Sequence, residues 1–161
     1  MINLFGYNLY AHFLVNNKKI LAYSLHFDKE KSYEHLIKIK RFHKLRGKIT
    51  SNEKLDKKLE KLLYKKIEED IKIKFDLSKY KNKEIYEFLL KIHKGKVSTY
   101  SEISKSVKKS IGEIIITLAR NPFLILIPCH RVIKKNGDIS GYTPLGKEFK
   151  RIILLKEGFL K

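Results

Sequence analysis

Two runs of apolar and aromatic residues stand near the start of the chain, at 10–15 and 20–27, with a polar stretch at 16–19 between them. Runs of this length that are bounded by turn-forming residues are typical of a β-hairpin, so we predict two paired strands here. Apolar and basic residues then alternate over 37–42. Alternation with a period of two predicts a further strand at 37–42.

Between Asn52 and Glu69 the spacing of the apolar residues changes from that of a strand to that of a helix. One apolar stripe there consists of Leu55, Leu59, Leu62, Leu63 and Ile67. Asn52 is a suitable N-cap for this helix. The alternating stretch 71–75 predicts a strand or an extended linker, and we place a domain boundary at 76–79. Residues 1–78 are therefore predicted to form a small N-terminal domain with a sheet and a helix.

Residues 79–161 are predicted to form a mainly helical C-terminal domain. Amphipathic stretches at 85–92 and 149–155 each predict a helix. Between them, Thr99 and Ser110 each stand three residues before a glutamate, which is the spacing of a helix capping box. Two short helices joined by a tight turn predict a helix-turn-helix, and the alternative is an ordinary helix pair. The fold class predicted for the whole chain is α+β.

Charge adds a candidate partner. The 161 residues include 36 Lys and Arg against 17 Asp and Glu, which gives a net charge of +19. Such an excess favours a polyanion as partner, nucleic acid first and an acidic membrane surface second, and a lysine-rich solubilising surface is the alternative. No stretch approaches the ~18 consecutive apolar residues of a membrane span, and the first residues do not resemble a secretory signal. We therefore expect a soluble, cytoplasmic protein that does not bind membranes.

The candidate chemistry centres on the only cysteine, Cys129, which lies in the sequence Ile-Pro-Cys-His-Arg at 127–131. A thiol beside a histidine is a candidate nucleophile, because thiolate is the reactive form of cysteine and a neighbouring base generates it. The alternative at this point is a buried structural cysteine. One cysteine allows no internal disulfide and no thiolate-rich metal site, so we expect no zinc and no other cofactor.

Four segments together resemble the O6-alkylguanine-DNA alkyltransferases, also called methylated-DNA–protein-cysteine methyltransferases. They are Asn121-Pro122, the Pro-Cys-His-Arg-Val core within 127–133, Gly141-Tyr142 and the Leu-Lys-Glu-Gly sequence at 155–158. The resemblance runs over about 85–158, roughly half of the chain. It implies direct-reversal DNA repair, in which a protein-cysteine methyltransferase moves the alkyl group of O6-alkylguanine irreversibly to Cys129 in a single turnover.

The resemblance also implies roles for individual residues. Cys129 would take the alkyl group, and His130, acting through a water, would remove the thiol proton. Glu157 would orient and charge the imidazole, Tyr100 would assist the departing guanine, and Asn121 would fix the turn that carries the cysteine. The target base is stacked in a duplex, so it would have to be flipped into a pocket. The residues expected to bind it are Val132, Tyr142, Thr143 and Arg131.

DNA binding is expected of the helix-turn-helix. The residues concerned are Thr99, Lys108, Lys109, Ser110, Ile111, Gly112 and Arg120. In the family, the second helix usually begins with an arginine that fills the gap left by the flipped base, and Gly112 stands there in this chain. Lys108, Lys109 or Ile111 could replace it, since apolar wedges also open a duplex. The expected partner is double-stranded DNA containing O6-alkylguanine, bound by a monomer and bringing the protein to the nucleoid.

Two other functions stay open. A DNA-binding protein that flips and holds the alkylated base with little or no transfer is favoured by the missing arginine at Gly112 and disfavoured by Cys129. A helix-turn-helix regulator with a structural cysteine would bind a specific DNA sequence, and it leaves the Pro-Cys-His-Arg run unexplained.

Overall fold

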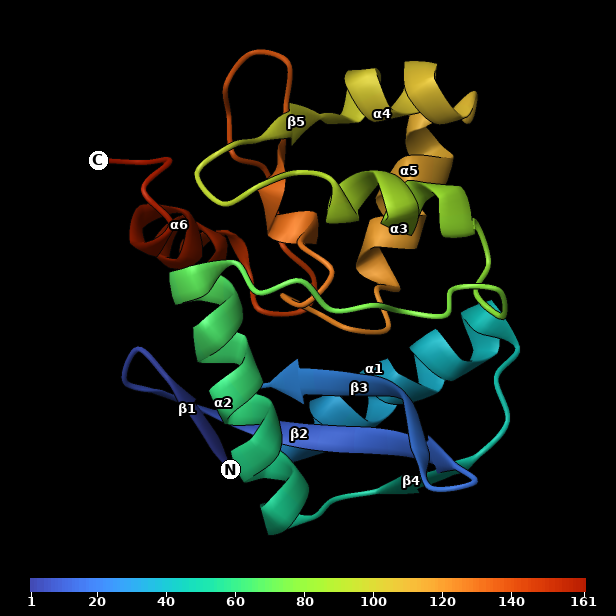
Figure 1. The fold of residues 1–161 in the computed structure, drawn as a ribbon. Helices are drawn as coiled ribbons and strands as arrows, with labels where there is room; N and C mark the ends of the chain where they lie inside the picture. The colour runs from blue at the N-terminus through green and yellow to red at the C-terminus, as the bar shows by residue number, and fades with distance from the viewer.

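The computed structural model describes residues 1–161 (Figure 1). The first half builds a four-stranded antiparallel sheet from β1 (Ile2–Leu4), β2 (Tyr7–Asn16), β3 (Lys19–His26) and β4 (Lys48–Thr50). β2 is the central strand, because it pairs with β3 along one edge and with β1 and β4 along the other. The predicted hairpin of β2 and β3 is confirmed, and its two-residue turn has the positive φ angles that such turns require.

The strand predicted at 37–42 is wrong, because these residues belong to α1 (Lys29–His43). Asp28 caps this helix by accepting the backbone N–H of Lys31 at 3.0 Å. The buried positions of α1 follow a helical spacing, and they are Ser32, His35, Leu36, Ile39 and His43. Three of these residues are polar, so the sequence concealed the helical period. α1 packs against β2 and β3.

α2 (Glu53–Glu69) is the helix predicted from the leucine stripe, and Asn52 is its N-cap. The Asn52 side chain accepts two backbone N–H groups of the first turn, at 2.8 and 3.2 Å. α2 ends at Asp70, which has a left-handed backbone conformation. The stretch 71–79 then crosses to the second half without forming a strand or a helix (Figure 1), so of the two alternatives the extended linker is correct.

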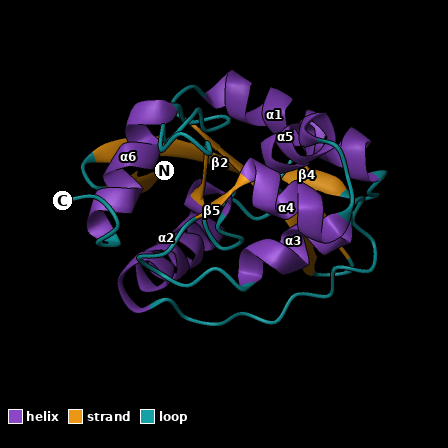
Figure 2. Cartoon of the chain, turned by 90° about the horizontal axis from the view of Figure 1, so that it is seen from above, coloured by secondary structure: helices purple, strands orange, loops and turns teal.

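The second half is mainly helical, as predicted. Its helices are α3 (Lys83–Leu90), α4 (Tyr100–Val107), α5 (Ile111–Ala119) and α6 (Lys147–Lys156). A 3₁₀ turn, η1, spans Cys129–Arg131, and β5 (Ser98–Thr99) pairs in parallel with β6 (Val132–Ile133). This pairing holds the entrance of α4 beside the segment that follows the cysteine, and α6 lies on the opposite side of β5 from α4 (Figure 2).

α4 and α5 form the predicted helix-turn-helix, with a left-handed Lys108 at the turn. The hydroxyls of Thr99 and Ser110 cap the two helices, and each accepts a backbone N–H at 3.1 Å. Only this half of each capping box is present, since the side chains of Glu102 and Glu113 accept hydrogen bonds from other residues. The two caps nevertheless fix where each helix begins.

One hydrophobic core of 36 buried residues runs through both halves. The backbone N–H of Tyr23 in β3 donates to the carbonyl of Pro122 at 2.9 Å, and the phenol of Tyr80 donates to the carbonyl of Leu21 at 2.5 Å. The sheet with α1 and α2 occupies one end of the molecule in Figure 1, and α3, α4 and α5 occupy the other. None of the helices combines the length and the apolar character needed to cross a bilayer.

Candidate active site

Cys129 opens η1 and is 5% exposed. Asn121, also buried, holds the loop that leads to it. Its Nδ2 donates to the carbonyl of Ile127 at 2.8 Å and to Cys129 Sγ at 3.3 Å, and its Oδ1 accepts the N–H of Phe123 at 2.9 Å. The apolar residues 123–127 are buried in the core. One amide side chain therefore ties both ends of this loop to the sulfur.

His130 and Arg131 share one buried carboxylate, that of Glu157 at the end of α6. His130 Nε2 lies 2.9 Å from Oε1, and Arg131 donates to Oε1 at 3.0 Å and to Oε2 at 2.5 Å. Asp70 accepts a further bond from Arg131 Nη1 at 3.1 Å. Burial acts to raise the pKa of Glu157, but His130 and Arg131 lower it to about 2. Glu157 is therefore ionised at neutral pH.

The contact with Glu157 fixes the tautomer of His130. An ionised carboxylate only accepts hydrogen bonds, so Nε2 carries the proton and donates it. Nδ1 is then the unprotonated nitrogen, and it is buried and accepts no bond from any protein group. Burial lowers the pKa of His130, against the opposing effect of Glu157. A neutral imidazole with an unused Nδ1 lone pair is suited to accept a proton.

The Cys129 thiol does not ionise unaided. Burial raises its pKa to about 11, while the hydrogen bond from Asn121 and the charge of Lys150 act to lower it. At neutral pH the thiolate fraction is then on the order of one in ten thousand. A nucleophilic role for Cys129 therefore requires a base, and the adjacent His130 has a nitrogen free to serve.

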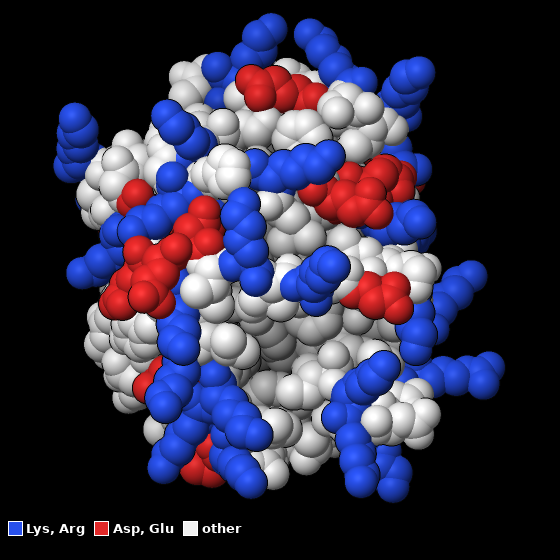
Figure 3. All heavy atoms as spheres, viewed as in Figure 1, with Lys and Arg blue, Asp and Glu red and all other residues white.

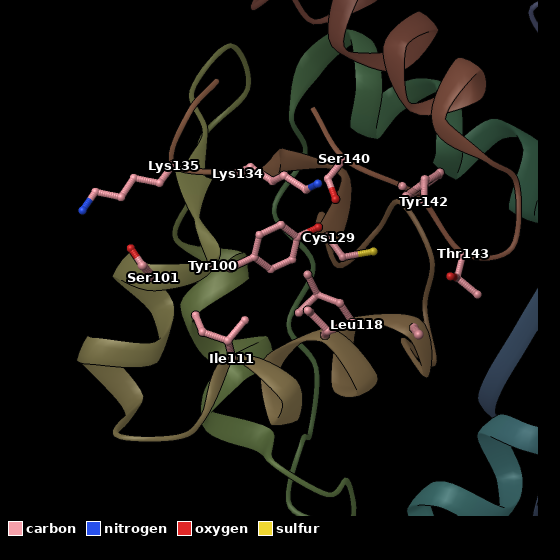
Figure 4. Close-up of a pocket in the computed structure, with 13 residues that line it drawn as sticks. Tyr100, Ser101, Ile111, Leu118, Cys129, Lys134, Lys135, Ser140, Tyr142 and Thr143 are labelled. Carbon is pink, nitrogen blue, oxygen red and sulfur yellow. The ribbon is translucent and has the colours of Figure 1, made fainter. Parts of the chain in front are cut away.

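Cys129 forms part of the wall of a pocket of about 390 Å³ (Figure 4). Tyr100, the first residue of α4, and Tyr142 and Thr143, from the loop before α6, line it as well. Burial raises the pKa of both phenols, so both stay protonated. The Tyr142 hydroxyl has no hydrogen-bond partner in the protein. A pocket with apolar walls and a few hydroxyl donors suits a planar heterocycle.

Two of the residues expected to bind substrate, Arg131 and Val132, do not line the pocket. The Arg131 side chain is fully buried, bonds Glu157 and Asp70, and lines no part of the pocket. Carboxylates at the ends of α6 and α2 bind its guanidinium, so the position of Arg131 does not support the expected role in binding substrate. The carbonyl of Val132 accepts from Lys150 Nζ at 2.6 Å, which leaves one of its two lone pairs free.

Lys150 was missed by the sequence reasoning. Its buried Nζ joins the carbonyl of Val132 to that of Gly141, the latter at 3.4 Å, and so links the strand after η1 to the pocket loop. Burial lowers the pKa of Lys150 to about 8. The only signal in the sequence is a lysine on the stripe that α6 buries with Phe149 and Ile153.

The candidate DNA-binding residues at the start of α5 lie beside the pocket. Ile111 lines it, and so do Ile115 and Leu118, which were not among the residues expected to bind DNA. Gly112 stands next to Ile111 in open space, where an added Cβ would meet only Ser110 Oγ, at 3.9 Å. The first turn of α5 is therefore unobstructed on this side.

The remaining candidates are already engaged in protein contacts. The hydroxyls of Thr99 and Ser110 cap helices, and Lys109 Nζ pairs with Glu84 at 3.2 Å. Arg120 donates to the carbonyl before it at 3.3 Å, and its own carbonyl accepts hydrogen bonds from α1 and α3. Lys108 forms the turn between α4 and α5.

On the face shown in Figure 3, basic side chains do not gather in one place. Figure 3 shows Lys and Arg projecting from all parts of the face in view, with smaller clusters of Asp and Glu between them. On this face, charge alone does not locate a binding surface.

Comparison of the sequence with known proteins gives consistent matches. Residues 81–159 match the family model described as the DNA-binding domain of 6-O-methylguanine DNA methyltransferase. A methylated-DNA–protein-cysteine methyltransferase of Thermococcus sibiricus is 34% identical over an alignment of 151 residues that covers 88% of this chain and 85% of the relative. A protein of the same name from Metallosphaera sedula is 38% identical over 92 residues, 57% of each chain.

Solved structures show the same fold. The crystal structure of an O6-methylguanine-DNA methyltransferase from Pyrococcus kodakaraensis aligns with a TM-score of 0.70 at 21% identity, over 93% of this chain and 92% of that one. A structure of such a protein from Methanococcus jannaschii aligns with a TM-score of 0.61 at 23% identity, over 100% and 95%. Both alignments include the N-terminal sheet, so the α+β class is confirmed for the whole chain.

Proposed function

Since the chain belongs to the methylated-DNA–protein-cysteine methyltransferase family, it binds DNA and acts in direct-reversal repair, and we propose that Cys129 is the residue that accepts the alkyl group. The observation that carries this proposal is the arrangement of three residues. Cys129 lines the pocket, His130 follows it with an unused Nδ1, and Glu157 holds the opposite nitrogen.

The proposed reaction is a displacement at the alkyl carbon. His130 Nδ1 takes the thiol proton, directly or through a water, and the thiolate of Cys129 attacks the carbon attached to guanine O6. A sulfur–carbon bond forms, the carbon–O6 bond breaks, and its electron pair stays on the guanine. Tyr100 supplies a proton to the departing guanine, and the proton held by His130 returns to solvent or to Tyr100.

Glu157 is a positioning residue in this scheme. By accepting a hydrogen bond from Nε2–H it keeps Nδ1 available, and its negative charge stabilises the imidazolium that forms during the transfer. Arg131 in turn holds the carboxylate in place through two hydrogen bonds. Asn121 fixes the sulfur relative to the pocket.

The transfer is proposed to occur once per molecule. The product is a thioether, whose sulfur–carbon bond is not readily hydrolysed and whose sulfur no longer carries the proton that His130 would remove. No second thiol is available, because the chain has one cysteine. The protein is thus consumed in stoichiometric amounts.

The substrate proposed is O6-alkylguanine in double-stranded DNA, bound by a monomer. The extruded base would enter the pocket beside Tyr100 and Tyr142, with Thr143 at its edge. We also propose that residues 79–161 carry the DNA-binding and catalytic functions. Residues 1–78 would support the loop that leads to Cys129, and the bond from Tyr23 to Pro122 favours that role.

Intact-protein mass spectrometry tests the proposal. The protein is mixed with duplex DNA containing O6-methylguanine, and we expect the mass of one methyl group, located on Cys129 by peptide mapping, with no second turnover. Cys129→Ser should remain unmodified and still bind the duplex. Binding of the lesion by the wild type without any mass gain would instead identify a protein that only holds the damaged base.

A further inference from the structure

α5 exposes an unusual amount of apolar surface for a nine-residue helix. Ile111, Ile115 and Ile116 are 41%, 52% and 37% exposed, and no other helix places three large apolar side chains in solvent. Exposed apolar residues that gather in one place mark a surface that another molecule covers. Ile111 and Ile115 are one helical turn apart and both line the Cys129 pocket, whereas Ile116 does not.

The surroundings of these isoleucines favour duplex DNA as the molecule that covers them. Lys108 and Lys109 precede Ile111 directly, and Lys134 and Lys135 line the same pocket. In Figure 4, Ile111 lies on one side of Cys129, and the two pocket lysines lie on the other. An apolar ridge flanked by cations matches the stacked bases and flanking phosphates of a duplex.

We propose that Ile111 and Ile115 form an apolar wedge that enters the base stack at the point where the target guanine leaves it. By filling this gap, the two side chains keep the guanine in the pocket. The inference rests on the proposed function, because it assumes that the target must leave a duplex. Side chains of this kind, inserted between base steps, unstack and hold open a duplex. The open space around Gly112 lets the first turn of α5 approach the DNA backbone closely.

The basic residues near the turn are poorer candidates for this role. Lys109 is paired with Glu84. Lys108 occupies the left-handed position between the helices, and its ammonium group would have to lose its water to enter a base stack. The isoleucines gain by leaving water, and β-branching restricts their rotamers, so they lose little conformational freedom on insertion.

The test compares transfer rates on two substrates for matched variants. Single-turnover rates are measured with O6-methylguanine in a duplex and in the same strand without its complement. For Ile111→Ala/Ile115→Ala we expect the ratio of duplex to single-strand rate to fall about tenfold or more. Ile116→Ala is the matched control, since it removes a similarly exposed isoleucine from the same helix, and its ratio should match that of the wild type.

A second measurement reports base extrusion without chemistry. In the Cys129→Ser background, 2-aminopurine at the target position of the duplex should brighten on binding, and the double alanine change should remove most of that increase. A duplex to single-strand ratio within about twofold of wild type, with fluorescence unchanged, would overturn the wedge. Loss of the proposed function itself looks different, because the wild type would then fail to alkylate Cys129 on the single strand as well as on the duplex.

Discussion

Asp70 and Arg131 form an ion pair, 3.1 Å between Oδ1 and Nη1, that joins the end of α2 to the turn that carries Cys129. Arg131 continues the connection to Glu157, and Glu157 to His130. The proposed catalytic base is therefore held by a chain of charges that begins at the half-buried Asp70 in the N-terminal half and is fully buried from Arg131 onward. A buried network of this kind is costly to interrupt, because removing one member leaves its partner without compensation.

Asp70→Asn should lower the free energy of unfolding by about 1–3 kcal/mol, since Arg131 and Lys66 both lose a charged partner. Chemical denaturation of the two proteins measures this. Glu148→Gln serves as the control, because its ion pair with Arg151 is exposed, and its effect should stay within about 0.5 kcal/mol. Equal effects of the two changes would contradict a structural role for the network.

The same carboxylates predict how stability depends on acid. For Asp70, burial acts to raise the pKa, but the hydrogen bonds from Lys94 and Lys66 and the charge of Arg131 lower it to about 2, from an ordinary 3.8. The pKa of Glu157 is also about 2, from an ordinary 4.5. Both groups bind protons more readily in the unfolded chain, so their contribution is complete above about pH 5 and is lost as the pH falls toward 2. Thermal unfolding across this range should show it, and Asp70→Asn should lose stability less steeply than the wild type.

His130→Ala should change the pH profile of alkyl transfer as well as its rate. Because the pKa of His130 is lowered, its imidazole is neutral at pH 7 and above. The wild-type rate should therefore be nearly constant above pH 7 and fall only in acid. Without the imidazole, the rate at pH 7 should drop by about 10²–10⁴-fold. It should then rise with pH toward the thiol pKa of about 11. Quenched time courses of alkyl transfer between about pH 6 and 10 would separate the two profiles. His93→Ala is the control, because this histidine is exposed and its loss should leave the pH profile unchanged.

Asn121→Ala should raise the pKa of Cys129 further, because the hydrogen bond from the Asn121 side-chain amide to Sγ acts to lower that pKa. The change also leaves the Phe123 N–H without its acceptor in a buried loop, which should cost about 1–3 kcal/mol. Thiolate ultraviolet absorbance against pH measures the first effect, and denaturation measures the second. A thiol that titrates at the wild-type pH would show that the hydrogen bond to sulfur is unimportant. Asn136→Ala, at an exposed turn, is the control.

DNA binding should weaken steeply with salt, since phosphate contacts by lysines release counterions. Between about 50 and about 200 mM salt, the affinity for an undamaged duplex should fall by about tenfold or more. Fluorescence anisotropy measures this. Alkyl transfer from the free base O6-benzylguanine involves no phosphate, and it should vary little over the same range.

Local signals were sufficient to predict much of this fold. Asn52, Thr99 and Ser110 act on the turn that directly follows them, so their capping roles could be read from the sequence. α1 was missed because three of its five buried residues are polar, and one of them, His43, bonds the carbonyl of Arg120. The strands β1 and β4 have three residues each, too few to establish a period.

The site, like the fold, has features that could be predicted from the sequence and features that could not. Cys129 lines the pocket and His130 contacts Glu157, which are the positions that the roles implied by the resemblance require. The contacts of Asp70 and Lys150 could not be predicted from the sequence. Asp70 bonds Arg131, which is 61 positions away, and Lys150 bonds the carbonyl of Val132, which is 18 positions away. Only the tertiary structure determines with which carboxylate an arginine forms an ion pair.

The continuous core that joins the two halves has a consequence for repair capacity. A protein that reacts once corrects no more lesions than there are folded copies of it, so the folded fraction sets the dose of damage that is tolerated. Because the two halves share the core, a destabilising change in the sheet lowers the number of folded copies, just as a destabilising change next to Cys129 does. Residues without any chemical role therefore govern how many lesions are erased.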